Sequence, residues 1–292
     1  MTTVAQYTID ALSLAGLYAM VALGIAIVFG IMRLVNFAHG ELIMLGGYAL
    51  LVFSTMPWGI AGVAAVAAVV VLALLMERVA FRPVRGADAP TLLVTSFAVS
   101  YLLQNVVILA TGARPKTIAL PSVLSTAVEF GGLRVQALHL LTIALTIVTV
   151  IGLSAFLKYT AAGIQMRAAA EDFGMARLVG VRADRVVAIA FLVSGLLAGV
   201  VSLLIVAQSD VLTPTMGVQI ALIGFVATVI GGMGSLVGAG LGGALLGILT
   251  VVLQATLPLQ VRSFRDAFAF MIVIGLLLIR PQGILGSPTL RV

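Results

Sequence analysis

Three polar side chains interrupt an apolar stretch near the start of the chain: the amide of Asn36, the imidazole of His39 and the carboxylate of Glu41. A carboxylate at the centre of a bilayer costs about 2.5–3.5 kcal/mol on insertion scales, so Glu41 needs a donor, water or a position near the interface. On a helix, Asn36, His39 and Gly40 share one face because residues three and four apart are neighbours. The polar groups on that face suit exposed backbone or the head group of a zwitterionic solute.

This segment has two interpretations. In the first, it is a polar cap on the end of a helix, with Asn36 as the capping side chain. In the second, it is the broken start of a helix beside a solute path, because interrupted helices line the binding sites of many transporters. The path residues that the second interpretation predicts are Asn36, Phe37, His39, Gly40 and Glu41.

The most charged stretch of the chain is 158–186, and its centre, 163–180, carries strong helix formers that end at Gly174. Such a segment could lie on the lipid surface as an amphipathic helix, or it could dock on a soluble partner. We favour docking, because a simple connector needs fewer helix-forming residues. The predicted docking residues are Arg167, Glu171, Asp172, Gly174, Arg177 and Gly180.

Glycines recur at a spacing of four residues in the second half of the chain. Small residues at this spacing let the backbones of two membrane helices approach closely. The interpretation that we favour is ordinary tight packing within a bundle, and the alternative is a moving or substrate-lining interface. The predicted packing glycines are Gly195, Gly199, Gly234, Gly238 and Gly242.

Several kinds of chemistry lack the residues that they need. The chain has no cysteine, which excludes disulfides, thiolate metal sites and cysteine nucleophiles. A phosphate-binding loop needs Gly-Lys-Ser/Thr, but neither Lys116 nor Lys158 follows a glycine. We therefore predict no catalytic residue, no metal site and no cofactor in this chain, and any ATP and Mg²⁺ would bind to a separate subunit. An intramembrane hydrolase with Ser235 and His139 as a dyad is a remote alternative.

The composition indicates that this chain lies in a lipid bilayer. Of its 292 residues, 62% are hydrophobic and 9% are charged, whereas a soluble domain carries about 25% charged residues. The bilayer must therefore solvate it, as a single transmembrane domain over 1–292. The net charge of +6 lies mostly in short loops between apolar runs, where it sets membrane orientation and predicts no nucleic-acid partner.

Apolar runs of spanning length predict an all-α, polytopic bundle of eight or nine transmembrane helices. The count depends on the last pair of long runs, which only Gly234 and Ser235 separate and which is either two spans or one broken, re-entrant element. The predicted helices are 9–31, 38–56, 59–80, 90–111, 137–157, 187–208, 217–233, 236–256 and 265–280.

Positive charges predict the orientation of the bundle. With nine spans, the loops on one side hold more than twice as many Lys and Arg residues as the loops on the other. Because cytoplasmic loops carry this excess, the N-terminus is predicted outside and the C-terminus in the cytoplasm. The richer side holds Arg33, Arg78, Arg82, Arg85, Lys158, Arg167, Arg177, Arg182, Arg185, Arg280 and Arg291, and the poorer side holds Arg114, Lys116, Arg134, Arg262 and Arg265.

The string Asn36-Phe37-Ala38-His39-Gly40-Glu41, with Gly46 and Tyr48 after it, resembles the branched-chain amino-acid permeases of ATP-binding cassette (ABC) importers. The loop from Arg167 to Gly180 resembles the same family, and so does Gly231-Gly232-Met233-Gly234-Ser235 with the glycine-rich helix that follows. The three matches occur in the family's order and together span nearly the whole chain.

The resemblance implies a permease subunit in a bacterial inner membrane that moves branched-chain or other hydrophobic amino acids, or related small solutes, into the cytoplasm. The implied partners are a second, related permease subunit, two cytoplasmic ATPases that bind ATP and Mg²⁺, and a periplasmic substrate-binding protein. The loop 163–180 would be the coupling segment that docks on an ATPase. The alternative is a secondary transporter or channel for a small neutral solute such as urea or an amide, although such proteins usually bury several ionisable residues, and Glu41 is nearly alone in the predicted spans.

Overall fold

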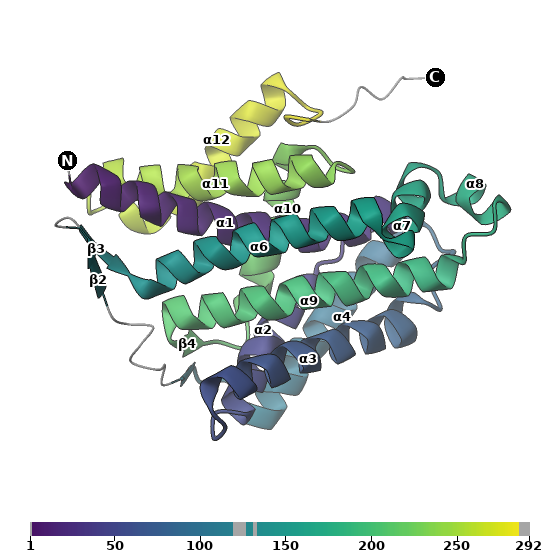
Figure 1. Ribbon diagram of the computed structural model, residues 1–292, viewed down its shortest axis with the longest axis horizontal. Coiled ribbons are helices and arrows are strands. Elements are labelled where there is room, and N and C mark those ends of the chain that lie inside the picture. Colours follow the sequence, from purple (N-terminus) through teal and green to yellow (C-terminus); the bar gives the residue numbers. More distant parts are fainter. Residues whose placement is uncertain (1, 119–126, 131–132, 286–292) are drawn as a thin grey trace.

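The computed structural model describes residues 2–118, 127–130 and 133–285, and most of this part of the chain is helical (Figure 1). Helices dominate because lipid offers no hydrogen bonds, so each spanning segment must satisfy its own backbone groups. The long helices run side by side along one axis of the molecule. The prediction of an all-α, polytopic bundle is confirmed.

In the described part of the chain, six helices are long and apolar enough to cross a bilayer, whose hydrocarbon core is about 30 Å thick. Two shorter apolar helices, α2 (Ala38–Val52) and α10 (Met216–Gly231), and a third short helix, α12 (Arg265–Ile279), accompany them. The long helices are α1 (Thr2–Met32), α3 (Trp58–Met76, continued by the π-helical turn Glu77–Phe81), α4 (Ala89–Thr111), α6 (Ala137–Tyr159), α9 (Ala183–Ser209) and α11 (Leu236–Thr256).

These nine helices coincide with the nine predicted segments, with differences of length at their ends. The largest is at α1, which begins seven residues earlier than predicted. Next come α2, which ends at Val52 rather than at 56, and α9, which begins at Ala183 rather than at 187. The predicted number of spans is not confirmed as such, because α2 has 15 residues, or roughly 22 Å at 1.5 Å per residue. Such a helix cannot cross the bilayer alone.

The pair α10 and α11 forms two separate helices that pack against each other, with a turn around residues 232–235 between them. Gly232 and Gly234 have φ values of +105° and +100°, which glycine adopts at little cost. The Ser235 hydroxyl then caps α11 by accepting a hydrogen bond from the Gly238 N–H at 3.0 Å. Gly234 therefore serves the turn, and its predicted role inside a packed helix face is wrong.

The other predicted packing glycines lie where helices touch. A Cβ built on Gly195 would lie 2.6 Å from the Ala73 Cβ, and one on Gly199 would lie 3.0 Å from the Val66 Cα, so both glycines face α3. A Cβ on Gly238 or on Gly242 would lie within 2.3 Å of a backbone oxygen of α10. At all four positions, the absent side chain is what lets two helices approach this closely.

The central helix of the bundle is α1, most of whose residues are buried between α6, α9, α10 and α11. Its closest neighbour is α11, where a Cβ on Gly243 would lie 2.6 Å from the Ala19 Cα and one on Gly247 would lie 2.5 Å from the Ala15 Cα. On the other side, Gly16 faces Thr146 of α6 equally closely. Glycine thus brings three backbones together in the N-terminal half of α1.

The two ends of the bundle differ. One end holds the N-terminus, the hairpin of β2 (Ala127–Phe130) with β3 (Leu133–Gln136), and a short antiparallel pair of β1 (Lys116–Thr117) with β4 (Val211–Leu212). The opposite end holds α7 (Ala161–Glu171) and α8 (Phe173–Leu178), which project beyond the long helices (Figure 1). Arg291, which contributed to the predicted orientation, lies outside the described residues.

Candidate functional site

The helix start at Ala38 lies inside the bundle. The chain leaves α1 at Met32, passes through Arg33 with a φ of +53°, and re-enters helical structure at Ala38. The His39 ring then packs directly on Gly24, where a Cβ would lie 2.5 Å from the ring. Gly24 is eight residues before the end of α1, or roughly 12 Å along the helix axis. The intervening residues therefore run back along α1, and the helix is broken.

Asn36 does not cap α2, so the capping interpretation is wrong. The residue in the N-cap position is Phe37, and no side chain accepts a hydrogen bond from the first turn. The backbone oxygen of Asn36 accepts from the His39 N–H at 3.2 Å, while its side-chain oxygen is buried without a partner among the described residues.

His39 ties the start of α2 to both α1 and α9. Its Nδ1 lies 3.0 Å from the Ser194 hydroxyl, which donates to the Gly24 carbonyl at 2.9 Å. A hydroxyl has one hydrogen, so when Ser194 donates it to Gly24 its oxygen accepts from an Nδ1–H of His39. The other ring nitrogen, Nε2, is buried without a hydrogen-bond partner in the described part of the chain.

Glu41 is fully buried where α2, α4 and α10 meet. Its Oε1 accepts hydrogen bonds from the Ser100 hydroxyl at 2.9 Å and from the Gln104 amide at 2.8 Å, both on α4. It lies in the first turn of α2 and against Gly217 in the first turn of α10. Helix N-termini favour negative charge, so two helix ends and two donors together offset the cost of burying this carboxylate.

The aromatic ring of Phe37 lies at the edge of the same junction. It stacks on Phe97 of α4 with ring centroids 4.4 Å apart, and it contacts Phe225 of α10 at 5.5 Å. Phe97 is 49% exposed, so this three-ring group, the phenylalanine cluster, reaches the surface of the subunit. It provides an apolar wall beside the Ser100 and Gln104 pair.

The predicted path residues therefore separate into two groups. Asn36, His39 and Glu41 are at most 1% exposed and lie inside the subunit, whereas Phe37 alone reaches a face. Gly40 is also buried, and a Cβ built on it would overlap the Gly217 carbonyl oxygen of α10 at 1.9 Å.

The partners of these residues were not predicted from the sequence. On α4, Ser96, Ser100 and Gln104 recur every four residues in an apolar helix and so mark one face, a signal that the sequence does carry. Ser194 and Gly217 carry no such signal, because a single serine or glycine in an apolar helix is ordinary.

The segment predicted to dock on a partner folds as two short helices. Thr160 caps α7 by accepting from the Gly163 N–H at 3.0 Å, and Asp172 caps α8 by accepting from the Met175 N–H at 2.9 Å. Met166 and Ala169 bury one face of α7 against the bundle. On and after α8, however, Met175 is 62% exposed and Leu178 and Val179 are each 81% exposed.

The predicted docking residues lie along both helices. Arg167 and Glu171 are exposed on α7, Gly174 and Arg177 are exposed on α8, and Gly180 turns the chain toward α9 with a φ of +89°. The C-terminal end of α7 also touches the broken segment, because the Arg33 guanidinium donates to the Ala170 carbonyl at 3.4 Å.

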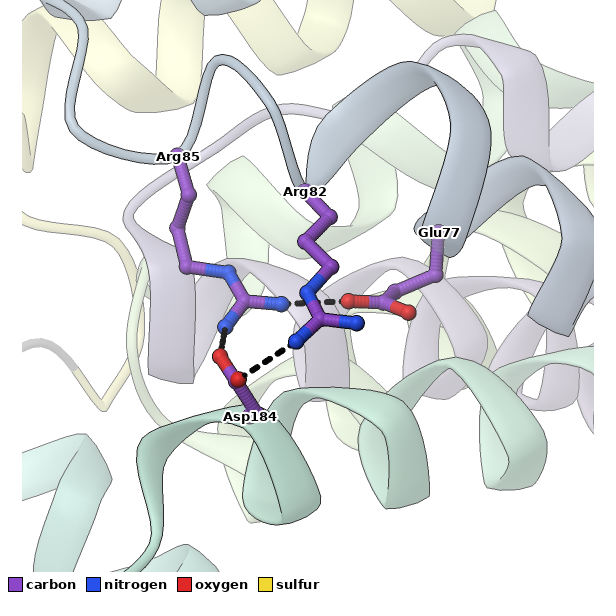
Figure 2. Close-up of polar contacts among 4 residues, drawn as sticks. All are labelled: Glu77, Arg82, Arg85 and Asp184. Atoms are coloured by element: carbon purple, nitrogen blue, oxygen red, sulfur yellow. Dashed lines mark hydrogen bonds and ion pairs between the residues drawn. The ribbon is translucent and has the colours of Figure 1, made fainter.

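An ion-pair cluster at the same end joins α3 to α9 (Figure 2). Asp184, at the start of α9, accepts from Arg82 at 2.8 Å and from Arg85 at 2.6 Å, and Arg85 also bonds Glu77. In the sequence, these arginines indicated only the orientation of the bundle. The cluster holds the connection after α3 against the helix that directly follows α8.

The hydrolase hypothesis is wrong on geometry. Ser235 caps α11 at the α7 end and faces Ser154 and Leu157 across a groove. His139 lies 15 residues before Ser154 on α6, or roughly 22 Å along the axis, and its Nε2 is 3.8 Å from the Asp10 carboxylate. The two side chains cannot form a dyad.

Comparison with known proteins agrees with a transport role. A family model for the permease component of branched-chain amino acid transport systems matches residues 7–279. The high-affinity branched-chain amino acid transport system permease protein BraD of Pseudomonas aeruginosa is 33% identical over 97% of this chain and 96% of its own length. The corresponding LivH protein of Escherichia coli K12 is 34% identical over the same shares.

A more distant relative, the probable branched-chain amino acid transport permease protein LivH of Methanocaldococcus jannaschii, is 26% identical over 93% of this chain and 89% of its own length. No solved structure matches the chain. The family is one of transport permeases rather than enzymes. With a family match over most of its length and relatives above 30% identity over nearly all of it, this chain belongs to the permease-component family of branched-chain amino acid transport systems.

Proposed function

We propose that this chain is a pore-forming subunit of an ABC importer that carries branched-chain or other hydrophobic amino acids into the cytoplasm. The observation that carries the proposal is the exposed apolar surface of α8 at one end of a bundle of membrane-length helices. A helix outside the lipid that exposes Met175, Leu178 and Val179 needs a partner to cover them. The relatives are named as permeases of branched-chain amino acid systems, which supports the substrate class.

The partners follow from the same surface and from the absence of a phosphate-binding loop in the sequence. Two cytoplasmic ATPases would supply ATP and Mg²⁺ binding, and α8 would dock on one of them. A second, related permease would complete the pore, and a periplasmic protein would deliver substrate. The α7 and α8 end would then face the cytoplasm of the bacterial inner membrane and the N-terminus would lie outside, as the distribution of positive charge predicts.

The solute path in this proposal runs along the face that carries the phenylalanine cluster. The rings of Phe37 and Phe97 would contact the apolar side chain of the substrate, and Gln104 lies beside them with Glu41 behind it. Glu41 would act through Ser100 and Gln104, setting the position of α4 relative to the starts of α2 and α10. The family comparison disfavours a channel or secondary transporter for urea or an amide.

Coupling between the docking surface and the path has a direct route. Movement of α8 would be passed to α7, whose C-terminal carbonyl at Ala170 binds Arg33. Arg33 begins the extended segment that leads to α2 and Glu41. A displacement of α7 would therefore reach Arg33 and the buried start of α2 directly, without being transmitted along a spanning helix.

Cross-linking tests the docking step. The natural chain has no cysteine, so Met175→Cys or Leu178→Cys introduces a single thiol on α8. We expect each to cross-link to the ATPase in the active complex, while Leu109→Cys, which is 87% exposed on α4, does not. Failure of both α8 variants to cross-link in a complex that still transports would contradict the proposal.

A further inference from the structure

A groove runs along the C-terminal half of α1, between α6 and α11, and encloses about 770 Å³. It extends from the level of Ala19 to Ile31 on α1, and its walls come from α6 and from the first half of α11. The C-terminal part of α7 closes one end with Met166, Arg167, Ala170 and Glu171. This groove is separate from the phenylalanine cluster and from α8.

The groove exists because three helices that touch at one end diverge toward the other. Close contacts at Gly16, Gly243 and Gly247 bring α6 and α11 onto α1 in its N-terminal half. Farther along, a Cβ on Gly240 would make only an ordinary contact with Leu23, at 3.8 Å, rather than meet a neighbouring backbone. The groove lies on this side of α1 and extends to α7.

The lining changes in character along its length. Beside α1 it is made of apolar and small side chains such as Leu23, Ile27, Leu153 and Leu241. At the α7 end it carries two cations, Lys158 and Arg167, with one carboxylate, Glu171. Arg33, bonded to the carbonyl of the lining residue Ala170, adds a third positive charge nearby.

We propose that this groove binds an anionic phospholipid, with an acyl chain along α1 and the phosphate head group at Lys158 and Arg167. The occupant follows from complementarity: an apolar slot that lies parallel to the spanning helices and ends at cations matches a tail joined to an anionic head. Basic pockets between transmembrane helices bind acidic lipid head groups for the same reason. Because the groove ends on α7, the bound lipid would stabilise the position of α7, the helix that leads into α8.

Native mass spectrometry of the purified transporter complex tests this, with dioleoyl-phosphatidylglycerol and dioleoyl-phosphatidylcholine added separately. We expect the parent complex to retain phosphatidylglycerol at least fivefold more than phosphatidylcholine. The double variant Lys158→Gln with Arg167→Gln should lose that preference. The matched control, Arg114→Gln with Lys116→Gln, removes the same charge at the opposite end of the bundle and should keep it.

A second pair of variants tests the apolar half without changing charge. Gly240→Leu fills the groove and should reduce phosphatidylglycerol retention, whereas Gly152→Leu places the same side chain in open space on the outer side of α6 and should not. Equal retention of the two lipids by the parent complex would overturn the proposal. So would unchanged retention in both groove variants, or efficient cross-linking of Gly240→Cys to the second permease subunit, since a protein helix would then occupy the groove.

Discussion

The Glu41 carboxylate lies directly against Gly217, so close that a Cβ built on Gly217 would be 2.4 Å from Glu41 Oε2. This contact joins the first turns of two short helices, α2 and α10. Glu41 and Gly217 are 176 residues apart in the sequence. A carboxylate between two helix N-termini is favourably placed, and glycine is what leaves room for it.

Gly217→Ala should therefore destabilise the protein. Alanine in place of a helical glycine normally gains about 1 kcal/mol, but overpacking costs about 1–3 kcal/mol, and here the overlap also displaces a carboxylate from Ser100 and Gln104. We expect a lower midpoint of thermal unfolding in detergent and less folded protein. Gly152→Ala, in open space on α6, is the control and should be neutral or stabilising. Equal midpoints for the parent and Gly217→Ala would show that the junction does not constrain the fold.

The charge of Glu41 can be separated from its shape. Glu41→Gln keeps the side-chain oxygen that faces Ser100 and nearly the same volume, so we expect the complex to assemble while uptake falls at least tenfold. Glu41→Ala leaves Ser100 and Gln104 without their acceptor, which costs about 1–3 kcal/mol for the buried Ser100 hydroxyl, and should reduce assembly as well. Uptake and the amount of assembled complex must be measured together. Normal uptake by Glu41→Gln would show that transport does not need the charge of Glu41.

His39 should act on stability through Ser194. His39→Ala removes the buried hydrogen bond to Ser194, and Ser194→Ala removes that bond together with the one to the Gly24 carbonyl. We expect a loss of about 1–3 kcal/mol for each partner that is left buried. The double variant should cost less than the sum of the two, since the second substitution removes a partner that is already unpaired. Unfolding midpoints of the four proteins measure this coupling, and strictly additive losses would mean that the two side chains do not interact.

Much of this arrangement could be predicted from the sequence, and the reasons for the failures are physical. Continuous apolar runs determine where helices form in a membrane, so nine helices were predicted nearly in place. The break before Ala38 could also be predicted, because Asn36, His39 and Glu41 are expensive in an uninterrupted span. The predicted number of spans is not confirmed at α2 and α10, since hydropathy does not show where a short helix begins relative to the bilayer.

The partners of the buried polar residues needed the structure. The Oε1 atom of Glu41 accepts from Ser100 and Gln104 on α4, its Oε2 has no hydrogen-bond partner among the described residues, and nothing in the local sequence selects α4. Similarly, Asn36 has the right residue type for a cap, but the backbone at Phe37 takes that position. The outward direction of the apolar side chains of α8 also needed the structure, because it depends on which face of α7 the bundle buries.

If α8 docks on the ATPase, substitutions on its exposed surface should uncouple ATP hydrolysis from transport. Replacing Met175 and Leu178 together with serine should weaken ATPase binding without affecting the fold, because both side chains are mostly exposed. Gly174→Leu, which adds bulk to the same surface where only the Asp172 carboxylate lies near, should lower uptake more than ATPase activity. Tyr159→Ser, exposed at the same end but outside α8, is the control. Retention of full uptake by both α8 variants would place the docking surface elsewhere.

Uptake of labelled leucine into proteoliposomes that contain this chain with its second permease and ATPase subunits tests the central claim most directly. The substrate-binding protein is added on the outer side and ATP is enclosed with the ATPases. We predict leucine accumulation that requires ATP hydrolysis and stops when the ATPase is replaced by a variant that binds but does not hydrolyse ATP. Accumulation that proceeds without ATP, driven by an ion gradient or by the leucine gradient alone, would contradict the assignment.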